Sequence, residues 1–132
     1  MAKLGKRSLS RLEGVDPRLV TLCHAVVKDF DITVIEGKRD LETQKKYVKE
    51  GKSKTLKSKH LEGRAIDIAP YPVDWENLAR FNYLAGMMFA YAHMMGVKLR
   101  WGNDWDNDKL FGIKGKTKGT ETFKDLVHFE LI

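Results

Sequence analysis

Apolar side chains recur every three or four residues in three segments of the chain, which predicts three amphipathic helices. The first occupies residues 17–30, with Asp16 as its N-cap and proline at the first helical position. The second occupies residues 40–50 and the third residues 74–95, after which Gly96 is suited to end the helix. The broad apolar stripe of the third segment indicates packing in a core.

Four shorter segments have the composition of β-strands: residues 32–35, 64–69, 97–101 and 126–131. Alternation along the second and fourth segments places their branched and aromatic residues on one face. Asp67 and His128 then point from the opposite face. A carboxylate in the middle of a strand is costly unless it is paired, so Asp67 is a first indication of a cation at this position.

The length of 132 residues is that of one domain, and no repeat or linker divides it, so we expect a single domain over residues 1–132. Residues 1–13 are basic and are expected to form a loose lead-in. Cys23 is the one cysteine of the sequence, which excludes an internal disulfide, and we expect it in the core. Neither an export signal nor a membrane-spanning segment is recognisable, so we expect folding in a reducing cytosol.

Positive charge is concentrated in one part of the chain. The 24 lysines and arginines exceed the 18 aspartates and glutamates, which gives a net charge of +6. The lysines crowd the segment before the second strand: Lys45, Lys46, Lys49, Lys52, Lys54, Lys57 and Lys59. Nucleic acid, an acidic membrane surface and the carboxylate-bearing bacterial cell wall are candidate partners for such a face, and a solvated face without a partner is also compatible with the sequence.

A second indication of a metal site comes from the histidines. His60 precedes Asp67 by seven positions, and a loop that runs into a strand between them can bring both side chains to one ion. A catalytic zinc ion takes three protein ligands and keeps one position for water, and His128 is the candidate for the third ligand. Beside such an ion, Asp125 can carry the proton and Arg39 can stabilise negative charge on the reacting group.

The segment of residues 102–120 is rich in glycine, aspartate and lysine and is expected to be a loop. Asp104, Asp106 and Asp108 alternate in it as the first ligands of a calcium loop do. An EF-hand would require glycine at the position of Lys109 and glutamate at that of Gly115, so a solvated loop is the favoured interpretation. The sequence leaves open whether a second metal ion, such as calcium, binds there.

Two sequence signatures relate the chain to a known group of enzymes. Residues 58–67 read S-x-H-x-x-G-x-A-x-D, and residues 125–128 fit [DE]-x-x-H. Together they resemble the signatures of zinc peptidases of the D-Ala-D-Ala carboxypeptidase and dipeptidase group. The short chain, the K-S-K-H-x-x-G-x-A-I-D-x-A-P-Y sequence and the ending H-F-E-L-I are most similar to the L-alanyl-D-glutamate endopeptidases that tailed phages use as endolysins. The resemblance extends from about residue 17 to the end.

The resemblance implies a small α+β fold with an antiparallel sheet flanked by helices, as in the Hedgehog signalling domain. The activity that it implies is hydrolysis of a peptide bond in peptidoglycan. By matching position, His60, Asp67 and His128 are the zinc ligands and Asp125 is the general base and acid. Asp125 stands where many relatives carry glutamate, whose arm is one methylene longer, and this difference favours the phage branch.

Three further roles follow from the resemblance alone. Arg39 matches an arginine that contacts the substrate carbonyl, and Ser58 matches the signature serine that is placed to bind substrate. Trp101, followed by glycine, matches an element that lines the substrate groove, although a tryptophan in a sequence is more often a packing residue.

Other functions remain open at this point. The same metal and base can serve a D-Ala-D-Ala carboxypeptidase or dipeptidase, which acts at the far end of the stem peptide. The fold can also form a non-catalytic, metal-stabilised binding domain, against which Asp125 argues. A basic nucleic-acid-binding module would show motifs that are missing here.

The expectation is therefore a monomeric zinc endopeptidase that cuts the L-Ala–D-Glu bond of peptidoglycan, without nucleic acid or stable membrane association. It would be made in the host bacterial cytoplasm and would reach the cell wall after another protein has breached the membrane.

Overall fold

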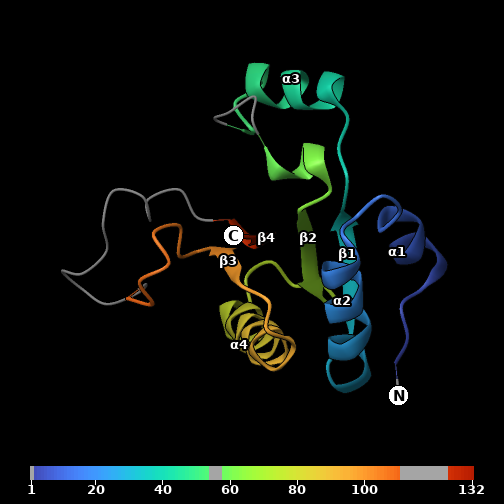
Figure 1. The fold of residues 1–132 in the computed structure, drawn as a ribbon, viewed down its shortest axis with the longest axis vertical. Coiled ribbons are helices and arrows are strands. Elements are labelled where there is room, and N and C mark those ends of the chain that lie inside the picture. The colour runs from blue at the N-terminus through green and yellow to red at the C-terminus, as the bar shows by residue number, and fades with distance from the viewer. Residues whose placement is uncertain (1, 54–57, 111–124) are drawn as a thin grey trace.

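The computed structural model describes residues 2–53, 58–110 and 125–132, which are built around a four-stranded antiparallel sheet (Figure 1). The strands are β1 (Ile32–Glu36), β2 (Ala65–Pro70), β3 (Leu99–Gly102) and β4 (Asp125–Leu131). They lie in the order β1-β2-β4-β3, so β4 pairs with β2 on one side and with β3 on the other. This confirms the small α+β fold with an antiparallel sheet.

Helices flank the sheet. α2 (Pro17–Asp29) and α4 (Leu78–Met95) pack against the sheet and against each other, and α1 (Lys6–Arg11) lies beside β1 (Figure 1). The short 3-10 helix η1 (Lys59–Glu62) lies between the sheet and α3 (Leu41–Lys49). Among the described residues, no helix is both long enough and apolar enough to cross a membrane.

The hydrophobic core lies between the sheet and the helices α2 and α4. Leu22 of α2 and Met88 of α4 are fully buried there, together with Ile66 of β2 and Phe129 of β4. The strand residues are the ones that alternation predicts. The intervening residues, Asp67 among them, belong to the other face of the sheet, which is therefore free to carry polar side chains.

The helix ends follow the predicted capping residues in most places. The carboxylate of Asp16 accepts a hydrogen bond at the start of α2, and that of Asp40 does so at the start of α3. Gly96 ends α4 with a φ of 70°, in the left-handed region that favours glycine. The start of α4 differs: Asn77 is the N-cap, whereas Asp74 accepts from a backbone amide in a turn before the helix.

The N-terminal segment is not the loose lead-in that its basic composition suggests. Residues 6–11 form α1, and Leu4 and Leu12 on either side of it belong to the hydrophobic core. The Ser8 hydroxyl accepts from the Val34 amide at 3.0 Å, and Arg11 donates to the Val34 carbonyl at 2.9 Å. β1 is an edge strand, so α1 supplies partners for backbone groups that would otherwise remain open.

Candidate metal centre and active site

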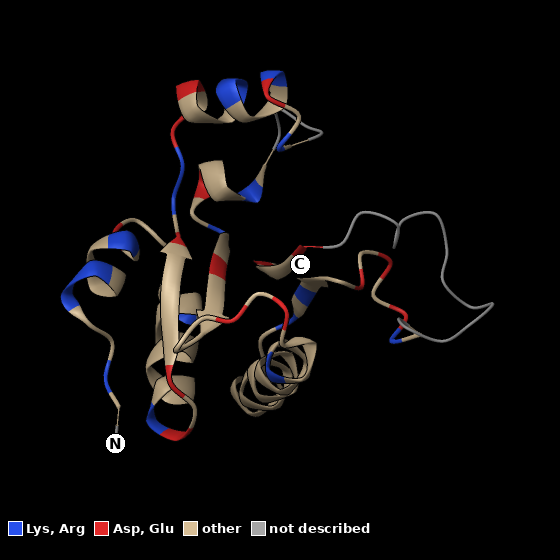
Figure 2. Cartoon of the chain, turned by 180° about the vertical axis from the view of Figure 1, so that it is seen from behind, with Lys and Arg blue, Asp and Glu red and all other residues tan. Residues whose placement is uncertain are grey.

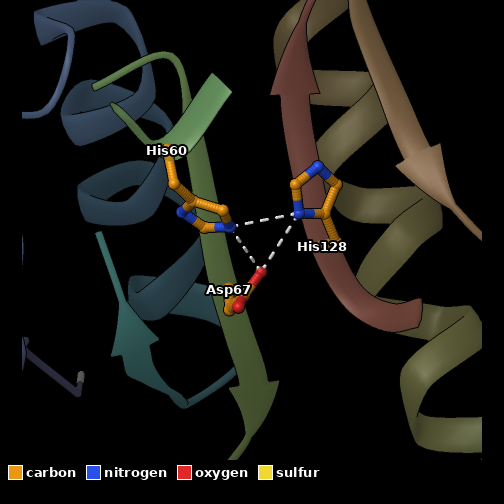
Figure 3. Close-up of side chains that lie close together, drawn as sticks. All are labelled: His60, Asp67 and His128. Atoms are coloured by element: carbon orange, nitrogen blue, oxygen red, sulfur yellow. Dashed lines mark hydrogen bonds and ion pairs between the residues drawn. The ribbon is translucent and has the colours of Figure 1, made fainter. Parts of the chain in front are cut away.

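The sheet brings Asp67 and His128 directly opposite each other. They are register partners in the antiparallel pair of β2 and β4, so both side chains leave the same face. His60 reaches them from η1, which lies over that face, and the three side chains converge (Figure 3). The structure therefore assembles the three residues that the sequence predicts as metal ligands.

The turn that carries His60 is fixed at both ends. The Ser58 hydroxyl accepts from the His60 amide at 3.2 Å and caps η1. Gly63 ends η1 with a φ of 71°, and a Cβ on it would lie 2.3 Å from the backbone oxygen of Gly14. Because an L side chain fits neither the conformation nor the space, the signature glycine is needed to hold His60 in place.

The donor atoms have the spacing of metal ligands. His60 Nε2, Asp67 Oδ1 and His128 Nδ1 are separated pairwise by 3.2 Å. Ligand atoms at about 2.0–2.1 Å from a tetrahedral zinc ion lie about 3.3–3.4 Å from one another. Two imidazoles and one carboxylate are also a donor set that divalent transition metals accept, so the residues present fit a bound metal ion.

The hydrogen bond on the far side of the His60 ring supports this assignment. Its Nδ1 lies 2.8 Å from the Gly37 carbonyl oxygen. A carbonyl oxygen can only accept, so Nδ1 carries the hydrogen, and the lone pair of the ring is on Nε2. Nε2 is the atom that points toward Asp67 and His128, as a metal ligand must.

The charges of the site also favour a cation. Burial raises the pKa of Asp67, but the contacts of its carboxylate with the rings of His128 and His60 hold the pKa below its ordinary value. Burial lowers the pKa of His128, whereas its hydrogen bonds to Asp67 and Glu130 raise the pKa to about 9. Without a metal ion, the site therefore retains a proton at neutral pH, which a metal ion has to displace.

Asp125 lies at the start of β4, opposite Gly102 of β3. A Cβ on Gly102 would meet the backbone oxygen of Asp125 at 2.1 Å, so this glycine allows the close approach of the two strands. Burial raises the pKa of the Asp125 carboxyl, and the negative charge of Asp67 raises it further. A half-buried carboxyl with a raised pKa beside the ligands is suited to accept and return a proton.

Arg39 lies between β1 and α3, at the junction that the sequence predicts. Its guanidinium forms an ion pair with Glu36, donates to Gln44 and lies over the Tyr47 ring, 4.6 Å from the ring centroid. Burial lowers the pKa of Arg39, while Asp67 and Asp125 are near enough to raise it. The structure thus places a rigid positive charge near the site, and its contact with a substrate carbonyl stays a prediction.

Ser58 and Trp101 are held by contacts within the protein. Ser58 caps η1, and a substrate contact for it stays a prediction. Trp101 is 1% exposed, its ring stacks on Phe129 at 6.3 Å between centroids, and its Nε1 donates to the Leu126 carbonyl at 2.9 Å. The structure therefore does not bring Trp101 to a substrate groove, because its side chain is used to support β3 and β4 from within the core.

Two side chains beside His128 were not among the predicted site residues. The ring of Trp105 lies 5.2 Å from the His128 ring, centroid to centroid, and Glu130 Oε1 lies 2.9 Å from His128 Nε2. Alternation along β4 does place Glu130 on the face of His128, so a signal for it exists in the sequence. Trp105 has no comparable signal, since it lies in a segment without periodicity.

The aspartates of the segment after β3 converge. Carboxylate oxygens of Asp104, Asp106 and Asp108 lie within 4.8 Å of one another, a grouping that can hold a metal ion. Asp104 is fully buried, and its Oδ2 accepts from the Lys109 amide at 3.1 Å. The interpretation as a solvated loop is therefore wrong for Asp104, whose carboxylate is turned inward.

Two histidines and an aspartate that converge over one face of a sheet, with a half-buried carboxyl beside them, are typical of metal-dependent hydrolases. The sequence profile of the phage L-alanyl-D-glutamate peptidase family matches residues 1–132. The chain belongs to this family and is a peptidase.

Individual relatives agree with the family. The L-alanyl-D-glutamate peptidase of Escherichia phage T5 is 32% identical over 112 residues, which are 79% of this chain and 82% of the phage T5 protein. The crystal structure of the L-Ala D-Glu endopeptidase ChiX of Serratia marcescens matches with a TM-score of 0.79 and 30% identity. This match covers 98% of the chain and 90% of the Serratia chain.

Proposed function

We propose that the protein is a zinc-dependent endopeptidase that hydrolyses the L-Ala–D-Glu bond of the peptidoglycan stem peptide and acts as a phage endolysin. The peptidase class follows from the family, and the metal is supported by one observation above all. This is the triangle of His60 Nε2, Asp67 Oδ1 and His128 Nδ1 with 3.2 Å sides. A zinc ion held there would act as a Lewis acid toward the scissile carbonyl and the attacking water.

The residues around the ligands can supply the proton transfers. Asp125, with its raised pKa, accepts the proton of the attacking water as the water adds to the carbonyl of L-Ala. The same carboxyl then returns the proton to the amino group of D-Glu as the peptide bond breaks. Proton uptake and release balance within one catalytic cycle, so no other acid or base is required.

Arg39 is proposed to stabilise the negative charge that develops on the carbonyl oxygen. Its guanidinium is held by Glu36 and by the face of Tyr47, so it does not have to be reoriented during the reaction. A fixed donor in a buried position is more effective than one in water, because little solvent or side-chain reorganisation is needed.

The lysines of α3 are proposed to draw the protein to its substrate. Lys45, Lys46 and Lys49 are exposed on α3, and Lys52 follows it. Figure 2 shows α3 beyond η1, with both basic and acidic positions on this helix. The bacterial wall is anionic, so attraction over about a Debye length raises the rate of encounter.

The cleavage site is tested by digesting purified peptidoglycan and identifying the new peptide ends. The proposal predicts a new N-terminal D-glutamate and no free D-alanine. Released D-alanine would instead identify a D-Ala-D-Ala carboxypeptidase or dipeptidase.

The metal and base are tested on the same substrate. The purified protein should contain one zinc ion per chain, which His60→Ala should lose together with activity. Asp125→Ala should keep the zinc and lose activity. If Asp125→Ala retained both zinc and the parental rate, Asp125 would not be the general base.

The endolysin role is tested in living bacteria. We propose that the protein is made in the host cytoplasm and reaches the wall only after the membrane is breached. Expression alone should then leave cells intact, and permeabilising the membrane should cause lysis within minutes. Cells that express the Asp125→Ala variant should keep an intact wall after permeabilisation, and lysis of these cells would count against the endolysin role.

A further inference from the structure

Glu130 lies on β4 two residues after His128, so both side chains project from the same face of the sheet. Its register partners are Ala65 on β2 and Arg100 on β3. The small side chain of Ala65 leaves room on this face, and Glu130 is only 7% exposed. A carboxylate is thus buried in the strand position next to the candidate metal ligands.

The Glu130 carboxylate contacts the ring of His128 on the side away from the other ligands. Glu130 Oε1 lies 2.9 Å from His128 Nε2, whereas His128 Nδ1 lies 3.2 Å from Asp67 Oδ1 and from His60 Nε2. A carboxylate accepts, so Nε2 carries a hydrogen, and when the ring gives up its second proton to a metal ion the lone pair is left on Nδ1. Glu130 thereby selects the nitrogen of His128 that faces the metal position.

Two cations hold the Glu130 carboxylate. Its Oε2 lies 3.4 Å from Lys59 Nζ and accepts from Arg100 at 3.3 Å. These contacts compensate the cost of burying the negative charge and fix the direction in which Oε1 points. Arg100 extends from β3, so the strand on the far side of β4 also takes part in fixing Glu130.

Lys59 adds a connection between the two parts of the site. It directly precedes His60 on η1, and its Nζ also donates to the Leu131 carbonyl of β4. The ion pair of Lys59 with Glu130 therefore ties the turn that carries one histidine ligand to the strand that carries the other. The pair spans 71 positions of the chain, from residue 59 to residue 130.

We propose that Glu130 is a positioning residue, which holds the His128 ring so that Nδ1 binds the metal ion, and that Lys59 and Arg100 hold Glu130 in turn. This positioning role rests on the proposed metal function, so the test of the role has to measure metal binding itself. Hydrogen-bonded carboxylates behind histidine ligands typically change metal affinity about 10–100-fold when removed.

The test measures the zinc Kd by competition with a chelator and, by 15N NMR of the zinc-loaded protein, which nitrogen of His128 binds. Glu130→Ala should weaken zinc binding about 10–100-fold and lose the uniform Nδ1 coordination. Glu130→Gln keeps an oxygen acceptor and should recover part of the affinity. Glu62→Gln, which removes an exposed carboxylate from the same turn as His60, is the matched control and should stay within about twofold of the parent.

The outcomes separate the two levels of the proposal. If the parent binds zinc and a folded Glu130→Ala binds it equally well through Nδ1, the positioning role is refuted while the metal function stands. A parent that binds no zinc refutes both. If Glu130→Ala does not fold, Lys59→Met and Glu130→Gln decide: each should weaken zinc binding severalfold more than Glu62→Gln, and equal affinities would overturn the role.

Discussion

Gly63 offers a sharp test of how the backbone holds the candidate metal centre. It ends η1 with a φ of 71°, accepts from the Asp16 amide through its carbonyl at 2.8 Å, and donates to the His60 carbonyl at 3.2 Å. In the Gly63→Ala variant, the new Cβ would lie 2.3 Å from the Gly14 oxygen. The substitution therefore adds a steric clash to a strained conformation.

Gly96 separates these two effects. Its φ is 70°, nearly that of Gly63, but a Cβ on it meets nothing within 4 Å. Gly96→Ala should thus cost only the left-handed conformation, about 1–2 kcal/mol. Gly63→Ala should cost the same plus about 1–3 kcal/mol for the overlap with a backbone atom that cannot rotate away, hence about 2–5 kcal/mol in total.

The measurement is urea unfolding of both variants in the presence of a chelator, so that metal binding does not contribute to the free energy of unfolding. Zinc affinity is then measured on the folded proteins. Gly63→Ala should also weaken zinc binding, because relieving the clash moves the turn that carries His60, whereas Gly96→Ala should not. Equal losses of stability and unchanged zinc affinity in both variants would refute the reasoning.

Three further predictions concern the core, the edge strand and the charged face. Burial raises the pKa of Cys23 to about 12, so the native thiol stays protonated where the unfolded thiol ionises. Above about pH 8.5 the parent should therefore lose about 1.4 kcal/mol of stability per pH unit relative to Cys23→Ala, and equal pH dependence of the free energy of unfolding in both proteins would contradict this. Ser8→Ala leaves the buried Val34 amide without its acceptor, and urea unfolding should show a loss of about 1–3 kcal/mol, against no more than a few tenths for the exposed Ser10→Ala. Raising the salt from 0.1 M to 1 M shortens the Debye length from about 10 Å to about 3 Å and should slow wall lysis by the parent more than by a variant with the α3 lysines changed to glutamine; equal slowing would show that these lysines do not attract the wall.

The parts of the fold that the sequence predicts are those with enough residues to show a period. α2 and α4 each extend over several turns, and the alternation of β2 and β4 correctly assigns Asp67 and His128 to one face. Six residues of α1 are too few for a periodic stripe, and its place depends on the open edge of β1, which is a tertiary feature. Helix α4 begins at residue 78 because the Asn77 side chain caps it, although Asp74 is an equally good capping residue by type.

The candidate site likewise has a part that the sequence predicts and a part that depends on tertiary packing. The ligand set can be predicted once β2 and β4 are assumed to be neighbours in the sheet. The other two requirements are local in the sequence: the spacing between His60 and Asp67, and the face of the strand from which His128 projects. The alternation of Leu99 and Trp101 does indicate a core position for Trp101. The contact of Trp105 with His128 depends on how residues 103–110 pack, which no local pattern encodes. The choice of ligand nitrogen likewise requires Gly37 and Glu130 to be located in space.

The position of β4 links metal binding to folding kinetics. β4 follows β1, β2 and β3 in the chain but lies between β2 and β3 in the sheet. β2 and β3 are therefore not bridged until β4 has entered, and its contact between Asp67 and His128 closes a loop of 61 residues. Contacts of such long range form slowly, because the chain loses the entropy of loop closure before the contacts that compensate for this loss have formed.

A metal ion that joins His60 and Asp67 to His128 would act as a reversible crosslink across this late step. It binds the native pairing of β2 and β4 and not the open chain, so it should slow unfolding more than it speeds folding. The ion proposed for hydrolysis would then also set how long the folded protein persists before it unfolds.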